Sequence, residues 1–343
     1  MNSAVRKLAR RTSRVARLVS PWVRPGDWRD AVFTIGDFVA ERGRLPRKPS
    51  RPDAGIMDHF FWRKHEPWSD LERRCCDKGL AKAVAQNLAS QVKVPRTVAT
   101  ISLAGITSGA QLADRVAPFL GRRLVMKPAH SNGGVVFLDH ASPDWDAYLR
   151  EARKPFFPVA RERQYHRLEP NVIIEEVLQA DDGGIPEDYK LFCFHGTPLL
   201  CQIDYDRFTQ HKRQLYLLPD WQRLDVAYSF PAGERTFPRP ATMDQAIDVA
   251  RALCAPFAFV RIDLYLMAGE VYFGEFTFTP DAGTKSFSDP AFDLALGDIL
   301  RVGLQDQLSP FTAPITAKQP TVPRTGSLRC AALRQRYADE NQR

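Results

Sequence analysis

The segment from 260 to 278 alternates apolar and polar residues on both sides of a short glycine-containing break. This alternation predicts a β-hairpin, because side chains along a strand point to opposite faces in turn. A three-residue loop at 268–270 places Asp263 almost opposite Glu275. Arg261 and Thr277 share their face by the same alternation. The other face presents apolar residues to a core, namely Ile262, Leu264, Phe276 and Phe278.

Two carboxylates that face each other on a sheet repel, and a cation between them reverses that interaction. Mg²⁺ commonly binds one or two carboxylates together with the phosphates of a substrate. Asp263 and Glu275 are therefore a candidate metal site. The alternative is an ordinary hairpin with one solvated face and a structural Arg261–Asp263 pair, and this segment alone leaves both interpretations open.

A second informative segment, 122–137, is predicted as strand, small-residue loop and strand. Small residues let backbone N–H groups approach a phosphate, and Lys127 adds a positive charge beside them. No G-K-[ST] sequence opens a helix here, so the loop is not a Walker A motif. A simple hairpin turn is the alternative. The loop residues are Ser131, Asn132, Gly133 and Gly134.

The third segment is a short apolar strand, 171–179, in which Glu175 and Glu176 follow the apolar residues. A polar turn follows, and then a strand that begins with Asp188 and contains Lys190. The two glutamates have a plain alternative interpretation as the solvated end of a strand. Their place between the glycine loop and the hairpin is what makes them informative.

The order of these segments resembles the ATP-grasp superfamily: lysine strand, glycine loop, acidic strand, D-x-K strand, then R-x-D and E-x-T-x-x-P-x-x-G. A helix with the pattern Asp77-Lys78-x-x-x-Lys82 before Pro95 also resembles the start of that fold. The runs DYKLFCFHGTPL and VYFGEFTFTPDAG are similar to the TupA-like subfamily, which is associated with cell-surface polymer biosynthesis. The resemblance covers roughly residues 58–300.

This resemblance implies an α+β fold in which two β-rich lobes clamp ATP. The expected organisation is a basic N-terminal segment and linker (1–57) and a reduced N-terminal domain (58–125). The small lobe follows (126–185), then the large lobe with the metal hairpin (186–308) and a C-terminal tail (309–343). Within these, 70–91 and 241–255 are predicted helical and 95–106 extended with a strand, from their hydrophobic spacing.

The resemblance also implies residue roles. Lys78 and Lys127 hold ATP phosphates, and residues 131–134 close over them. Glu175 and the backbone from Glu176 to Leu178 meet the adenine, and Asp188 meets the ribose. Nearer the reacting groups, Lys190 and Arg207 lie by the phosphates or the acceptor, and Arg261 stabilises the transferred phosphoryl group.

In the same comparison Asp263 and Glu275 bind Mg²⁺. Many ATP-grasp enzymes carry Asn two residues after the metal-binding Glu, and here that position is Thr277. A hydroxyl has a shorter reach, so the number of metal ions, one or two, stays open.

The expected activity is therefore carboxylate–amine ligation with ATP and Mg²⁺, on a small-molecule or saccharide carboxylate and an amine. Two alternatives remain. The pattern Asp204-x-Asp206 matches the D-x-D motif of metal-dependent glycosyltransferases, and the Thr277 departure is compatible with a non-catalytic ATP-binding protein of the same fold.

Composition narrows the class further. The chain has 343 residues, 44% of them hydrophobic, and no apolar run of 18 residues, so no transmembrane helix is expected. Its six cysteines show no C-x-x-C spacing, which favours free thiols in a reducing cytoplasm. The basic residues do not interleave with aromatic ones in any recognisable module, so nucleic-acid binding is not expected.

The net charge of +8 is concentrated at the N-terminus, where residues 1–20 hold six basic residues and no acid. Apolar residues there have approximately helical spacing, so a basic helix lying reversibly on the inner membrane face is one interpretation. A mitochondrial presequence and a disordered basic tail are the others. The proline- and arginine-rich segment 41–53 is interpreted as a linker.

Overall fold

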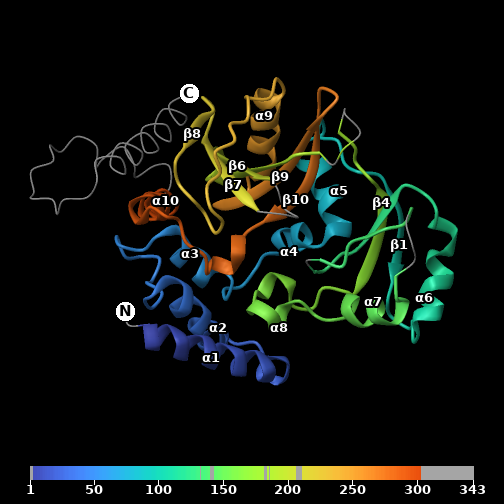
Figure 1. Ribbon diagram of the computed structural model, residues 1–343, viewed down its shortest axis with the longest axis horizontal. Coiled ribbons are helices and arrows are strands. Elements are labelled where there is room, and N and C mark those ends of the chain that lie inside the picture. Colours follow the sequence, from blue (N-terminus) through green and yellow to red (C-terminus); the bar gives the residue numbers. More distant parts are fainter. Residues whose placement is uncertain are drawn as a thin grey trace, which may run out of the picture.

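The computed structural model describes residues 3–131, 133–139, 143–180, 184, 186–205 and 211–302. Two antiparallel sheets form its framework (Figure 1), a four-stranded sheet in the order β1-β4-β2-β3 and a six-stranded sheet in the order β10-β9-β5-β6-β7-β8. The small sheet lies on one side of the molecule and the large sheet on the other, with α4 and α5 between them. The α+β architecture with two β-rich lobes agrees with the sequence-based expectation.

The small sheet is built from short strands that are apolar on one face. Its strands are β1 (Thr97–Ser102), β4 (Asn171–Glu176), β2 (Leu124–Pro128) and β3 (Val136–Phe137). Helices α6 (Gly109–Val116) and α7 (Trp145–Ala152) cover one face and share a core with it, which includes Leu112, Met126 and Ile174. The other face is left for the cavity described below.

The large sheet is buried on both faces. Its strands are β10 (Glu270–Thr277), β9 (Phe259–Met267), β5 (Asp188–Phe194), β6 (Thr197–Tyr205), β7 (Lys212–Leu217) and β8 (Gln222–Leu224). Helix α9 (Met243–Cys254) shares one core with it, and α3 (Ile56–Arg63) and α10 (Pro290–Val302) share another. This double burial explains why β6 is buried along its whole length.

The region predicted helical over 70–91 forms two helices, α4 (Asp70–Cys76) and α5 (Lys78–Leu88). They are separated at Asp77, whose backbone is extended and whose carboxylate accepts hydrogen bonds from the N–H groups of Gly79 and Leu80. An aspartate in this position caps the start of a helix and so favours the break. The helix predicted over 241–255 and the strand predicted within 95–106 are confirmed as α9 and β1.

The N-terminal residues form a helical layer below the large sheet (Figure 1), made of α1 (Ser3–Val19) and α2 (Asp27–Arg42) with a short 3-10 turn, η1 (Ser20–Trp22), between them. The expectation of a disordered tail is therefore wrong for the described part. Asp30 of α2 anchors the layer, since it accepts ion pairs from Arg161 at 2.6 Å and Arg163 at 2.7 Å. Arg161 directly follows α8 (Phe157–Ala160), and Arg163 is the first residue of η3 (Arg163–Tyr165).

Segment 41–53, interpreted above as a linker, is irregular but docked. Arg44 pairs with the fully buried Asp58 at 2.6 Å, and the backbone N–H of Arg47 donates to the same carboxylate at 2.8 Å. Arg47 also donates to the carbonyl of Asp53 at 2.5 Å. These contacts hold the segment against α3, so it does not act as a free tether.

Two shorter 3-10 elements, η2 (Ala117–Phe119) and η4 (Pro280–Gly283), complete the described chain. Five cysteines among the described residues are free, as expected, and all five are buried. No helix among the described residues is long and apolar enough to cross a membrane. The C-terminal tail, 309–343, lies outside the described residues.

Candidate functional site

The β9–β10 hairpin pairs Asp263 with Glu275, as predicted, but by a different route. The turn holds two residues, Ala268 and Gly269, both with positive φ, instead of three. A β-bulge at Gly274 then inserts one residue into β10 and restores the predicted register. A Cβ atom at Gly274 would lie 2.9 Å from the carbonyl oxygen of Asp263, so this position requires glycine.

A cavity of about 440 Å³ opens between the two sheets, with α5 along one side. It gathers ten of the residues predicted to belong to the site: Lys78, Lys127, Gly133, Glu175, Glu176, Leu178, Asp188, Lys190, Asp263 and Glu275. These residues come from α5, from both sheets and from the segments that join them, across almost 200 positions of sequence. Their individual roles remain predictions.

The large-sheet side of the cavity carries a network of ion pairs. The guanidinium of Arg261 donates to both oxygens of Asp263, at 2.7 and 2.8 Å, and Lys190 donates to Asp263 at 2.6 Å. Lys190 also pairs with Asp188. Burial alone would raise the pKa of Asp263, but Arg261 and Lys190 outweigh it and hold that pKa below its usual range. Asp263 is therefore an anion in the folded protein.

Glu275 differs from Asp263 in its exposure. Its side chain is 39% exposed, against 3% for Asp263, and its nearest guanidinium nitrogen, on Arg261, lies 3.5 Å away. Glu275 therefore offers the accessible carboxylate of the pair. Among the described residues no group of three His, Cys, Asp or Glu side chains could hold a metal ion, so protein ligands alone do not complete a metal site.

The small-sheet side of the cavity is dominated by lysines. The ammonium groups of Lys127 and Lys82 both pair with the buried carboxylate of Glu175. Burial is the main reason that the pKa values of Lys78 and Lys82 lie below their usual value, and nearby carboxylates only partly oppose it. Three lysines thus share this side with one buried carboxylate. Glu175 is therefore occupied by ammonium groups, and the contact with adenine that the resemblance implies stays a prediction.

The predicted phosphate loop is positioned by α5. Lys78 donates through Nζ to the carbonyl of Ser131 at 2.7 Å, and its backbone N–H donates to the carbonyl of Ala129 at 2.9 Å. Gly133 and Gly134 both have positive φ, a conformation that glycine adopts without strain. Asn132 lies outside the described residues. The loop therefore meets the cavity as a glycine backbone next to an ammonium group.

One end of the cavity is apolar. Its lining there includes Val125 and Phe137 from the small sheet and Val177, Leu178 and Pro186 from the segment that joins the sheets. Glu176 turns away to Arg96, whose guanidinium donates to it at 2.5 and 3.0 Å. A flat apolar ring fits such an end, with the backbone around 176–178 at its edge.

Some predicted residues are not in the cavity lining. Arg261 and Thr277 stand behind Asp263, and the hydroxyl of Thr277 accepts a hydrogen bond from Arg261 at 3.1 Å. Ser131 and Gly134 belong to the loop but do not line the cavity either. Arg207 lies outside the described residues, as does Asp206 of the D-x-D motif.

The basic residues Lys212 and Arg213, which follow that motif in the sequence, belong to the large sheet. Both residues are in β7, and Arg213 is buried. Its guanidinium pairs with Asp204 at 2.8 Å and with Asp281 at 3.2 Å. Asp204 is thus paired with a guanidinium and is not among the residues that line the cavity.

The residues that line the cavity without having been given a role from the sequence include Lys82, Tyr265 and Gly274. Two of them carried a usable signal. Lys82 follows Lys78 by four positions on a helix, so both project from one face. Tyr265 follows Asp263 by two positions on a strand and so shares its face.

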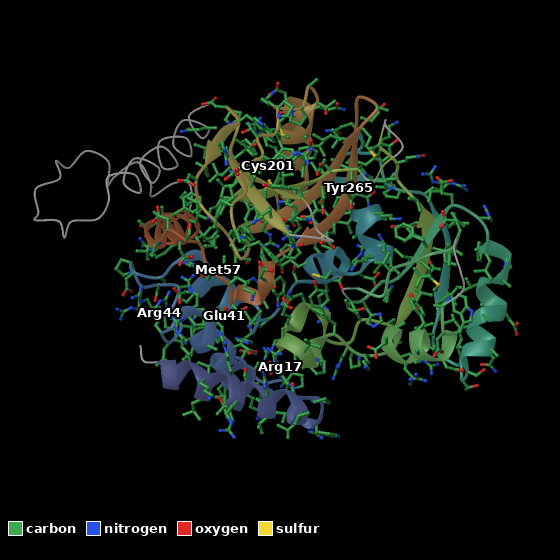
Figure 2. The ribbon with its side chains drawn as sticks, viewed as in Figure 1. Arg17, Glu41, Arg44, Met57, Cys201 and Tyr265 are labelled. Carbon is green, nitrogen blue, oxygen red and sulfur yellow. The ribbon has the colours of Figure 1, made fainter. Side chains whose placement is uncertain are left out.

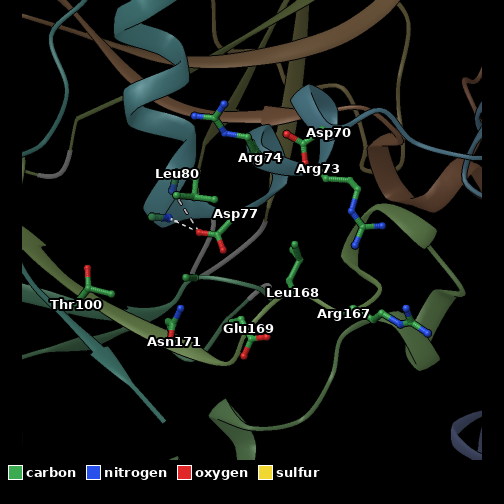
Figure 3. Close-up of a pocket in the computed structure, with 12 residues that line it drawn as sticks. Asp70, Arg73, Arg74, Asp77, Leu80, Thr100, Arg167, Leu168, Glu169 and Asn171 are labelled. Atoms are coloured by element: carbon green, nitrogen blue, oxygen red, sulfur yellow. Dashed lines mark hydrogen bonds between the residues drawn. The ribbon is translucent and has the colours of Figure 1, made fainter. Parts of the chain in front are cut away.

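A second hollow, of about 400 Å³, lies at the other side of the α4–α5 junction (Figure 3). Asp77 and Leu80 stand at its top, Thr100 and Asn171 at its lower edge, and Arg167 to one side. Its other charged residues are Asp70, Arg73, Arg74 and Glu169. The acids and the arginines balance there, so it lacks the excess of lysines found beside the β9–β10 hairpin.

Comparison with known families identifies the class to which this α+β fold belongs. The model of the family described as TupA-like ATPgrasp matches residues 106–301, more than half of the chain. The chain therefore belongs to the TupA-like ATP-grasp family. No curated protein matches it.

Among solved structures, this chain is similar to the D-alanine–D-alanine ligase from Bacillus anthracis, with 16% identity and a TM-score of 0.33 over 60% of this chain and 56% of that one. It is also similar to the phosphoribosylamine–glycine ligase from Thermotoga maritima, with 15% identity and a TM-score of 0.40 over 69% and 57%. In both cases the match spans under two thirds of the solved protein's length.

Proposed function

We propose that this protein is an ATP-dependent carboxylate–amine ligase whose active site is the cavity between the two sheets. The observation that carries the proposal is the pairing of a lysine-rich side with a carboxylate-bearing side across one space. ATP needs both kinds of surface, because its phosphates are anionic and its bound Mg²⁺ is cationic. Membership of the TupA-like ATP-grasp family supports the same assignment.

In this proposal the adenine occupies the apolar end, against Val125 and Phe137, and the phosphates extend toward Lys78, Lys127 and the glycine loop. Backbone N–H groups in a glycine-rich loop bind phosphate oxygens well, because no side chain blocks their approach. Lys127 would exchange part of its contact with Glu175 for a phosphate oxygen. Glu175 then serves to hold two ammonium groups in place at the start of binding.

The carboxylates fit Mg²⁺ as the partner of those phosphates. Asp263 and Glu275 are directly opposed and present oxygen atoms, the ligand type that Mg²⁺ prefers. With only two such carboxylates on the hairpin, the phosphates complete the coordination. When bound, the ion would neutralise charge on the phosphates during transfer. Lys190 and Arg261 would hold Asp263 in a single orientation for that purpose.

The proposed reaction has two steps. A carboxylate oxygen of the substrate attacks the γ-phosphorus of ATP and ADP leaves, which yields an acyl phosphate. The nitrogen of an amine then attacks the acyl carbon, phosphate leaves, and an amide forms. No protein nucleophile is required, since alignment and charge stabilisation perform the catalysis. We further propose a uronic acid or another saccharide carboxylate as acceptor, in the synthesis of a surface polysaccharide or polyanionic polymer.

A trapping experiment tests the proposal. The protein is incubated with Mg-ATP and a panel of uronic acids, with and without amino acids, and ADP release is measured. Hydroxylamine is added in parallel, because it converts an acyl phosphate into a hydroxamate that can be detected. We expect ADP release that requires a carboxylate and hydroxamate that requires ATP. Turnover of a nucleotide sugar instead would favour the glycosyltransferase alternative, and nucleotide binding without any turnover would favour a non-catalytic protein.

A further inference from the structure

Helix α1 exposes its large apolar residues to solvent, which is unusual for a helix of a globular protein. Leu8, Val15 and Leu18 recur at spacings of seven and three, which places them on one face, and their side chains are 61%, 62% and 71% exposed. Helices that pack on a core normally turn their apolar stripe inward. Here the stripe faces solvent along the lower edge of the molecule, where the side chains of α1 project outward (Figure 2).

The inner face of α1 is specified by small and polar residues instead. Ala9 and Ser13 are buried against α2, at Gly36, where an added Cβ would come within 3.1 Å of the Ala9 carbonyl oxygen. Ser13 donates to Asp37 at 2.5 Å and Arg17 donates to the same carboxylate at 2.8 Å. These specific contacts set the rotation of the helix, so the outward stripe is part of the fold and is not a consequence of a loosely held end.

The exposed apolar surface continues past the end of α1. Trp22 and Trp28 flank the turn into α2 and are 81% and 69% exposed, and Val32, one turn later, is 61% exposed. Isolated exposed apolar residues are ordinary. In the described part of the chain, however, seven of the twelve large exposed ones fall between 8 and 32: Leu8, Val15, Leu18, Val19, Trp22, Trp28 and Val32.

The same surface is strongly basic. Eight exposed Lys or Arg side chains lie between 6 and 29, and no acidic side chain described between 6 and 40 is classed as exposed. Asp30 is buried under Arg161, and Asp37 is paired with Arg17. The exposed basic residues are Arg6, Lys7, Arg10, Arg11, Arg14, Arg17, Arg24 and Arg29.

We propose that this surface, formed by α1, η1 and the first turns of α2, docks the protein on a lipid leaflet rich in anionic headgroups. The apolar stripe would enter the boundary between headgroups and acyl chains, and the guanidinium groups would pair with lipid phosphates. Tryptophans favour that boundary, because the ring is apolar and its N–H is polar. The attachment is reversible and sensitive to salt.

The charge on this surface argues for lipid over the other occupants. A second copy of the chain docked through the same surface would bring two sets of eight cations together, and none of the acidic side chains described between 6 and 40 is exposed to offset them. A nucleic acid would match the charge but would leave the apolar stripe in water. An anionic leaflet satisfies both features at once. The inference does not depend on the ligase activity, because the surface lies outside the cavity.

The test uses the full chain and vesicles of phosphatidylcholine alone or mixed with phosphatidylglycerol, sedimented at low and high salt. Binding is expected only with phosphatidylglycerol and is expected to weaken strongly at high salt. Arg10→Gln/Arg11→Gln/Arg14→Gln should lower the partition coefficient about 100-fold, because each of the three cations near the leaflet contributes roughly fivefold. Leu8→Ser/Val15→Ser/Leu18→Ser should abolish binding without changing the net charge.

The matched control is Arg115→Gln/Arg150→Gln/Arg251→Gln, which removes three positive charges, two exposed and one partly exposed, from elements remote from α1 and should bind as the parent does. Thermal unfolding of each variant and Mg-ATP binding verify that the fold is kept. The proposal is overturned if the parent chain fails to sediment with phosphatidylglycerol at low salt, or if the control loses as much binding as the arginine variant. It is also overturned if the serine variant converts a dimer into a monomer, because the stripe would then bind a second copy.

Discussion

The two sides of the cavity carry charges of opposite sign. The small-sheet side has three lysines, Lys78, Lys82 and Lys127, and one buried carboxylate, Glu175, which pairs with Lys82 and Lys127. On the large-sheet side, Asp188, Asp263 and Glu275 outnumber Lys190 and Arg261. The first side is left with an excess of positive charge and the second with an excess of negative charge. An anion that carries a cation of its own fits between them.

The difference between the sides lies also in how tightly the charges are held. Asp263 is enclosed by two cations at 2.6 to 2.8 Å, and its oxygens are almost fully buried. Lys127 keeps a quarter of its side chain exposed and has one partner. The large-sheet side is therefore a rigid platform, and the small-sheet side is the one whose contacts can be exchanged for those of a ligand.

The largest effect is expected from the two carboxylates of the hairpin. Asp263→Asn and Glu275→Gln should each lower Mg²⁺-dependent turnover by roughly 10³-fold or more, because charge stabilisation of the transferred group depends on them. Only Asp263→Asn should also destabilise the fold, by about 3–5 kcal/mol, since it leaves Arg261 and Lys190 without their shared buried partner. ADP release measures the loss of turnover in each variant, and urea denaturation measures the loss of stability. Equal loss of stability in both variants would contradict the described difference in burial.

Lys127→Met should weaken Mg-ATP binding by about 1.5–3 kcal/mol, the usual contribution of a hydrogen bond to a charged group. Calorimetric titration measures it. Lys93→Met is the matched control, because Lys93 is exposed, lies outside the cavity and pairs only loosely with Glu270 at 4.0 Å. Unchanged affinity in Lys127→Met would remove this lysine from the phosphate site.

Gly274→Ala should cost about 1–3 kcal/mol of stability, because a Cβ at 2.9 Å from the Asp263 carbonyl forces the bulge to move. Turnover should fall with it, since the bulge is what sets Asp263 opposite Glu275. Gly269→Asn, at a turn position with open space and positive φ that Asn tolerates, serves as the control. Chemical denaturation and steady-state kinetics of the pair of variants decide the point. Normal turnover in Gly274→Ala would show that the bulge does not position the carboxylates.

The smallest effect is a pH dependence that separates the two sides. Burial lowers the pKa values of Lys78 and Lys82, whereas Asp263 and Asp188 overcome burial and raise the pKa of Lys190. As pH rises toward 10.5, the usual lysine value, the small-sheet side loses positive charge first. Mg-ATP affinity should therefore fall several-fold below pH 10.5 while Lys190 stays charged. Affinity that is constant up to pH 10.5 would contradict this order of titration.

The same pKa directions set opposite trends for stability. A lysine with a lowered folded-state pKa binds fewer protons than in the unfolded chain, so its contribution to the free energy of unfolding improves as pH rises toward 10.5. Lys190 has a raised pKa, so its contribution is complete below 10.5 and is lost above, as pH passes the folded value. Lys190 therefore still contributes its full share to the free energy of unfolding just below pH 10.5. Weaker nucleotide binding at that pH would not be caused by a loss of this contribution.

The sequence was sufficient for features that depend on local periodicity. Strand alternation placed Asp263 opposite Glu275 and turned Ile262 and Phe276 into the core, and both placements are present in the structure. The predicted loop length was wrong, yet the pairing was right, because a two-residue turn and a one-residue bulge together equal a three-residue loop in register. Helical spacing likewise put Lys78 and Lys82 on one face of α5.

Only the tertiary structure decided which charges meet. Glu175 and Lys82 are 93 positions apart, and their contact exists because the fold brings a side chain of α5 to a side chain of β4. Arg213 pairs with Asp204 and Asp281, which lie 9 and 68 positions away in the sequence. The amphipathic pattern of α1 was visible in the sequence, but not that its apolar side is the exposed one. Periodicity fixes which residues share a face, whereas the packing of distant elements determines what that face meets.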